Sequence, residues 1–217
     1  MRFVPLLLAA ALVAPPVQAQ TARSADDARA VLAAVLAHQV SIRGLESAAQ
    51  ACVTAALAPP PVAAGEEDPM MPDHAVRIYF QWHVPEAPAV IRPASPRPPE
   101  GQRRRNRERP PPVVLPAPIP ADQAQRLDAL RAEAARSQAA PAVDQVDAAL
   151  LTPPMQLQGM NNGCAPLQLS APGFAGDTAF VETAYACGTT CGNGSLYALQ
   201  RREGRWQVVA VADTWIS

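Results

Sequence analysis

Four cysteines are the residues of this sequence with the most distinctive chemistry. Cys187 and Cys191 lie four positions apart in the stretch CGTTCGNG, whereas Cys52 and Cys164 each stand alone. Disulfide bonds, a redox-active dithiol and a zinc site are the three chemistries that such residues could serve. If all four form disulfides, three connectivities are possible, and the sequence alone does not choose among them.

The local chain favours a short disulfide between Cys187 and Cys191. A disulfide needs Cα atoms about 4.4–6.8 Å apart, but four residues of extended chain span about 13 Å. The chain must therefore turn between the two sulfurs, and the glycines that follow each cysteine permit a turn because they adopt positive φ angles. A companion bridge from Cys52 to Cys164 would close a loop of roughly a hundred residues and hold the fold together.

The redox and metal chemistries fit this spacing less well. Catalytic dithiols usually have the spacing C-x-x-C at the start of a helix. Here three residues separate the cysteines, and no Lys or Arg lies within nine residues of either one. Zinc usually takes four ligands in two close pairs, whereas Cys52, Cys164 and the three histidines are scattered. We therefore expect neither a metal nor a cofactor.

Carboxylates and histidines are the remaining candidates for catalysis. Glu182 and Asp213 lie on predicted strands of one sheet, where they could meet as paired carboxylates with divided acid and base roles. His83 lies on the polar side of another predicted strand. No G-x-S-x-G, H-E-x-x-H or S-x-x-K motif accompanies them. Solvent-exposed acidic residues are therefore the simpler interpretation, and we assign no catalytic residue.

The first twenty residues predict the compartment. MRFVPLLLAAALVAPPVQAQ has a basic start at Arg2 and the triplet VQA before position 20. With an apolar run of about eleven residues between them, it is typical of a secretory signal peptide, residues 1–19, cleaved after Ala19. The run is shorter than the about 20 residues that span a bilayer, and we expect no transmembrane segment in the mature chain. The protein should be periplasmic or secreted, where cysteines form disulfides.

Charge and proline content mark one unusual segment. The chain carries 18 Lys+Arg against 19 Asp+Glu, a balance that does not favour nucleic acid as a partner. Residues 85–120 hold 12 prolines, which interrupt helices and strands, and so predict a disordered insertion. It would loop out of a single domain formed by residues 20–84 and 121–217. Its arginine run could contact an anionic envelope surface: Arg103, Arg104, Arg105, Arg107 and Arg109.

The remaining segments predict an α+β fold. Apolar spacing predicts helices over 24–40, 121–137 and 141–151, the first of them capped by Ser24. Alternating residues predict a strand over 74–84, and we expect further strands over 165–170, 178–186, 195–201 and 205–217. Three consecutive strands in the C-terminal third are joined by short turns, which require an antiparallel arrangement. We expect an antiparallel sheet with a C-terminal three-strand meander, two or three helices on one face, and Trp206 as a core anchor.

The C-terminal third also resembles a known family. The pattern CGxxCGxG, a run ending in Leu, a GxW turn, a Val-rich strand and a final W-I-S resembles the tail of a family of exported bacterial proteins of uncharacterised function. The resemblance covers residues 164–217 well and 24–57 loosely. Usual members are Lys-rich in the last hairpin, where this chain has Arg201, Arg202 and Arg205. The resemblance implies export and the local fold, and it brings no known activity.

These features favour a non-enzymatic exported protein, a binding or envelope-associated accessory module. The alternative is a small periplasmic hydrolase or ligand-processing enzyme with a cleft over the sheet that uses His83 or Glu182. The two classes differ in the surroundings of these side chains. A closed pocket with a polar partner within about 3.2 Å of His83 or Glu182 would favour the enzyme, whereas solvent exposure of both would disfavour it.

Overall fold

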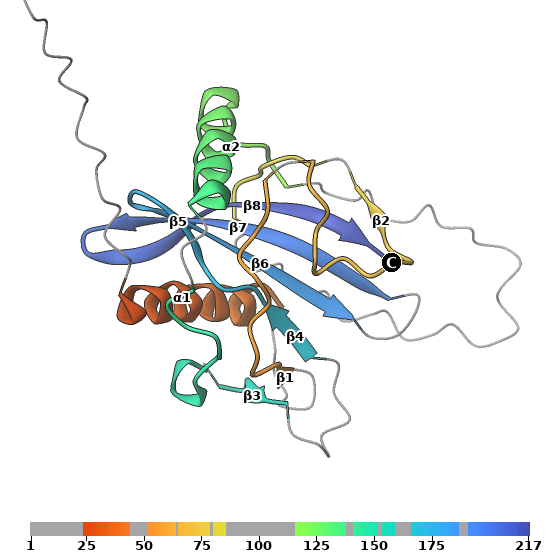
Figure 1. The fold of residues 1–217 in the computed structure, drawn as a ribbon, viewed down its shortest axis with the longest axis vertical. Helices are drawn as coiled ribbons and strands as arrows, with labels where there is room; N and C mark the ends of the chain where they lie inside the picture. Colours follow the sequence, from red (N-terminus) through yellow and green to blue (C-terminus); the bar gives the residue numbers. More distant parts are fainter. Residues whose placement is uncertain are drawn as a thin grey trace, which may run out of the picture.

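A sheet of eight strands lies between two helices in the computed structural model of the chain (Figure 1). The structure describes residues 24–43, 52–63, 65–78, 80–85, 116–137, 141–151, 153–158, 166–186 and 191–217. The signal peptide and the arginine run predicted above lie outside these residues, so both stay predictions. Among the helices that the structure describes, none is long and apolar enough to cross a membrane.

Three long antiparallel strands form the centre of the sheet. They are β6 (Thr178–Ala186), β7 (Gly192–Arg202) and β8 (Arg205–Ile216). The turn between β7 and β8 is the pair Glu203-Gly204, and both residues have positive φ, 51° and 75°. Positive φ at both central positions is what a two-residue hairpin needs to match the twist of its strands. The predicted α+β class and the C-terminal meander are therefore confirmed.

Short strands from distant parts of the chain complete the sheet. The strand order is β2-β8-β7-β6-β4-β1-β3, and β5 pairs with β6 off this path. β1 lies parallel to both β3 and β4, and the other pairs are antiparallel. The bounds of these strands are β1 (Cys52–Val53), β2 (Val76–Arg77), β3 (Gln156–Leu157), β4 (Pro166–Leu169) and β5 (Gly173–Ala175).

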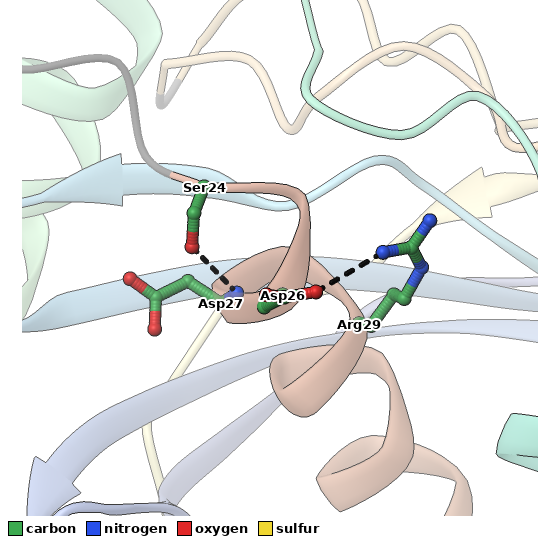
Figure 2. A network of polar contacts seen from close by, with 4 residues as sticks. All are labelled: Ser24, Asp26, Asp27 and Arg29. Atoms are coloured by element: carbon green, nitrogen blue, oxygen red, sulfur yellow. Dashed lines mark hydrogen bonds and ion pairs between the residues drawn. The ribbon is translucent and has the colours of Figure 1, made fainter.

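The first helix, α1 (Ala25–Arg43), begins as the sequence predicts. The Ser24 hydroxyl accepts a hydrogen bond from the backbone N–H of Asp27 at 3.1 Å (Figure 2). This bond satisfies one of the free N–H groups of the first turn. The Asp26 carboxylate, which is favoured at the positive end of the helix dipole, also pairs with Arg29 at 3.2 Å (Figure 2). The N-terminal cap and the acidic first turn thus fix where the helix starts.

The two helices cover opposite faces of the sheet, so the prediction that they share one face is wrong. α1 packs on the face that carries Ala179 and Val181, whereas α2 (Ala121–Arg136) packs on the face that carries Phe180. Figure 1 shows α2 above the sheet and α1 below it. Neighbouring residues of a strand point to opposite faces, and both faces of β6 are apolar. Each face therefore needs its own cover.

The third predicted helix, over residues 141–151, is also wrong. The segment forms one short 3-10 turn, η3 (Ala148–Leu150). The backbone of residues 144–146, before this turn, pairs with residues 55–57. Val146 N–H bonds to the Ala55 carbonyl at 2.7 Å, and the Asp144 carbonyl accepts a hydrogen bond from Leu57 N–H at 3.0 Å. These partners replace the hydrogen bonds between residues four apart that an α-helix requires.

The strand predicted over residues 74–84 is only partly formed. Val76 and Arg77 pair with the end of β8, and His83 pairs with β8 again at Val211. The segment uses two residues more than β8 does between these contacts, so its middle leaves the ladder. The predicted alternation therefore fails at both ends: Trp82 is buried, but Val76 and Val84 are 64% and 49% exposed.

The end of the predicted insertion belongs to the folded part of the chain. The Ala117 carbonyl accepts a hydrogen bond from Val84 N–H at 2.8 Å, and Ile119 N–H bonds to the Trp82 carbonyl at 3.2 Å. The Ile119 side chain is buried against α2. Residues 86–115 lie outside the described residues, and the insertion there stays a prediction.

Candidate functional site

Glu182 is a buried acidic residue in the middle of the sheet. It lies on the α2 face of β6, between Phe180 and Ala184, and its side chain is 2% exposed. The Thr214 hydroxyl of β8 donates a hydrogen bond to Glu182 Oε1 at 2.9 Å. Carboxyl groups are almost never fully buried without partners, so the groups that surround Glu182 define the candidate site.

Two segments cover Glu182 from above the sheet. The first is α2, whose Arg131 is 8% exposed and donates from Nε to the Val62 carbonyl at 2.9 Å. The Arg131 guanidinium also lies over the Phe80 ring, 5.2 Å from its centroid. The second segment is residues 65–78, which we call the strap. It contributes Asp68, whose carboxyl group is hydrogen-bonded to Glu182.

The surroundings of Glu182 favour its protonated form. Burial, followed by the hydrogen bond and the charge of Asp68, raises the pKa of Glu182 to about 8, although Thr214 and Arg131 act to lower it. Burial likewise lowers the pKa of Arg131, against the opposing effects of Glu182, Asp128 and Asp68. An arginine nevertheless keeps its charge in proteins. At neutral pH the site therefore holds a protonated Glu182, the Asp68 carboxyl and a guanidinium.

Trp215 lies beside this group, beneath the strap. The indole is fully buried and packs with Met70 and Ala75 of the strap and with Ala184 of β6. Its Nε1 is buried without a hydrogen-bond partner in the part of the chain that the structure describes. Buried polar groups usually have such a partner, and among the described residues Trp206 Nε1 and His83 Nε2 share this lack.

A glycine and a bulge place Trp215 next to the Thr214 hydroxyl. The register of β7 and β8 shifts between Gly194 and Ser195, which leaves Thr214 unpaired between Asp213 and Trp215. A Cβ atom on Gly194 would overlap both the indole nitrogen of Trp215 and the hydroxyl oxygen of Thr214. The two polar groups therefore lie side by side over Gly194, and a bulge that redirects side chains is common near functional sites.

The favoured interpretation of Glu182 as a solvent-exposed acidic residue is wrong, because it is 2% exposed, whereas Asp213 is exposed as expected. The alternative, a pair of carboxylates formed by Glu182 and Asp213, is wrong as well. Asp213 pairs with Ser195 across the strands and accepts a hydrogen bond from its hydroxyl at 3.0 Å, on the α1 face of the sheet. Glu182 faces the other way. The true partners were missed because Asp68 lies in an irregular segment and Arg131 on a helix whose facing strand the sequence does not specify. The one available signal was an acidic residue in an otherwise apolar strand.

The histidines lie apart from Glu182. His83 Nδ1 is 3.3 Å from the Val84 carbonyl, and its backbone pairs with Val211. His38 lies on α1, where its ring meets Tyr197 edge-on with centroids 5.7 Å apart, and burial lowers the pKa of His38. No cluster of three His, Cys, Asp or Glu that could hold a metal occurs among the residues that the structure describes.

The other predicted residues are placed in part. Cys52 and Cys191 each take part in a disulfide bond. Cys164 and Cys187 lie outside the described residues, so which cysteines pair with which stays a prediction. Trp206 is a core anchor, as predicted: it is buried, 5.9 Å from the Phe174 ring and 5.1 Å beneath the Arg201 guanidinium.

Comparison with models of protein families, with curated proteins and with solved structures gives no match. The resemblance of residues 164–217 to an exported bacterial family therefore stays a prediction from the motif alone.

Proposed function

We propose that the protein is an exported, non-enzymatic binding module whose ligand site lies on the sheet face beneath the strap. The observation that carries this proposal is the fully buried Trp215 indole, whose N–H has no hydrogen-bond partner within the described residues. An acceptor atom of a ligand would satisfy this N–H. The signal-peptide pattern at residues 1–19 supports export, and weak contact of the arginine run at 103–109 with an anionic envelope surface is part of the same proposal.

The side chains on this sheet face and on the strap that covers it suit a small apolar ligand. The floor of the face carries the small side chains of Ala58 and Ala184, and its cover carries Met70 and Met71. Methionine side chains adapt to irregular shapes and are common at binding surfaces. An apolar body with one acceptor oxygen, which could approach the Trp215 N–H, is therefore the class of ligand that the face would take.

Native mass spectrometry of the protein purified from the periplasm of an expressing bacterium tests this proposal. We expect a bound small molecule on the wild-type protein and loss of most of it from a Trp215→Phe variant, which lacks the indole N–H. Trp206→Phe is the matched control, because its buried indole lies on the α1 face, and it should keep the ligand. A wild-type mass equal to that of the bare chain, or equal loading of both variants, would contradict the proposal.

A second candidate, a small hydrolase, is favoured by Glu182. This side chain is closed off from solvent with a polar partner at 2.9 Å, and a carboxyl whose pKa is raised to about 8 suits a general acid. Hydrolysis of 4-nitrophenyl acetate tests this candidate. Turnover by the wild type that is lost in Glu182→Gln would support it, and a wild-type rate equal to that in buffer would contradict it.

A further inference from the structure

We propose that the strap is a latch, which closes over Trp215 while Glu182 holds a proton and opens when that proton is lost. This inference goes beyond the proposed function, because it concerns access to the sheet face and applies whatever that face binds. It rests first on how the strap is built and where it is attached.

The strap is braced internally and can move as one piece. Arg77 near its end donates to the Glu66 carbonyl near its start at 2.6 Å. Within it, Met70 N–H bonds to the Asp68 carboxylate at 2.8 Å and Ala75 N–H to the Pro72 carbonyl at 2.9 Å. Gly65 at its start has φ of 90° and open space around it. A self-bonded loop that begins at a glycine is a suitable moving element.

Three attachments hold the strap on the sheet. The Asp68 carboxyl is hydrogen-bonded to Glu182, Met70 and Ala75 pack on Trp215, and β2 at its end pairs with β8 through Val76 and Arg77. The last pairing is short, because beyond Val76 and Arg77 it adds only the bond from Ile78 N–H to the Thr214 carbonyl at 3.3 Å, and the Val76 side chain is mostly exposed. The contact between Asp68 and Glu182 is therefore the attachment whose strength a single proton controls.

The charged groups around Glu182 explain why a proton matters. Asp68 of the strap, Arg131 of α2 and the neutral Thr214 hydroxyl of β8 act on Glu182 directly, whereas Asp128 of α2 and Arg77 of the strap act on Arg131. Asp128 is already bound to the Trp82 indole at 2.8 Å, and Arg131 to the Val62 carbonyl. When Glu182 loses its proton, two carboxylates face each other in a desolvated site, which is unfavourable even though the Arg131 guanidinium attracts both. Opening of the strap separates them and admits water.

The direction of the pH dependence follows from the two states of Glu182. In the closed state its pKa is about 8, whereas in the open, hydrated state it returns toward its usual value near 4.5. The closed state therefore binds the proton more tightly. Closure is favoured fully below about pH 4.5 and weakens as pH rises toward about 8, by up to about tenfold per pH unit. Above about pH 8 both states are ionised, and the balance changes no further.

Hydrogen exchange of the ligand-free protein at pH 6 and pH 8 tests the latch. Each wild-type measurement is compared with Glu182→Gln at the same pH, so that the intrinsic pH dependence of exchange cancels. A neutral Gln can still accept from Thr214 and donate to Asp68, so this variant should stay closed. We expect wild-type strap peptides to gain exchange over the variant by about tenfold per pH unit, while peptides of β6 and β7 stay protected.

Two variants make the outcome specific. Asp68→Asn removes the facing charge but keeps an oxygen for Met70 N–H, and it should weaken the pH response of the strap without abolishing it, because burial is the larger cause of the raised pKa of Glu182. Asp213→Asn alters a carboxyl on the α1 face and should retain the wild-type response. The latch is wrong if strap and sheet peptides lose protection together, or if wild type and Glu182→Gln exchange alike at both pH values. Because no ligand is added, neither result depends on the proposed binding function.

Discussion

A Gly194→Ala protein is expected to be about 2–3 kcal/mol less stable than the wild type, the cost typical of an extra group forced into a packed core. The added methyl group would overlap the indole nitrogen of Trp215 and the hydroxyl of Thr214. Both side chains must then shift, and the shift disturbs the hydrogen bond from Thr214 to Glu182. The midpoint of urea-induced unfolding at constant pH measures the effect.

Gly173→Ala is the matched control for this substitution. Gly173 also lies on a strand, but the nearest atom to an added Cβ there is 3.6 Å away, an ordinary contact distance. We expect its stability to change by no more than about 0.5 kcal/mol. Equal losses in the two variants would show that close packing over Gly194 is not what sets the cost.

Replacement of Glu182 with Gln is expected to remove most of the pH dependence of stability between pH 5 and pH 8. Because folding raises the pKa of Glu182 from 4.5 to about 8, the folded protein binds a proton that the unfolded chain releases. Its stabilising effect is complete below about pH 4.5 and is lost as pH rises toward about 8. The wild-type free energy of unfolding should fall by about 1 kcal/mol per pH unit over this range.

The comparison with the wild type isolates Glu182 from other titrating groups. Burial lowers the pKa of His38, so His38 acts in the opposite direction and favours the folded state more as pH rises through this region. That contribution is common to both proteins and cancels in the difference. Urea titrations at half-unit pH steps give the two slopes. If the free energy of unfolding of Glu182→Gln changes with pH as steeply as that of the wild type, Glu182 does not hold a proton in the folded protein.

The sequence predicts the parts of the fold that local patterns control. Ser24 and the acidic residues after it predict the start of α1, and the turn at Gly204 predicts the hairpin of β7 and β8. Segment 141–151 was mistaken for a helix because its backbone partners at residues 55–57 are remote in sequence. Periodicity reports which residues share a face, but it does not report which segment covers that face.

The candidate site shows the same limit. Glu182 stands out in the sequence as a carboxyl in an apolar strand, but its partners depend on register and on covering segments. The bulge at Gly194 turns Thr214 and Trp215 toward one face, and no pattern of alternation predicts that. Asp68 reaches the site from a strap without periodicity, and Arg131 reaches it from the helix that covers the second face. Long-range packing supplies all four of these neighbours.

The central claim is that Glu182, beneath the strap, holds a proton at neutral pH. Its direct test is the titration of the Glu182 side-chain carboxyl by carbon-13 NMR, with the resonance assigned by its absence from Glu182→Gln. The account predicts a midpoint near pH 8. A midpoint near the ordinary value of about 4.3 for glutamate would contradict it, since Glu182 would then be charged at neutral pH and could not hold the strap through a shared proton.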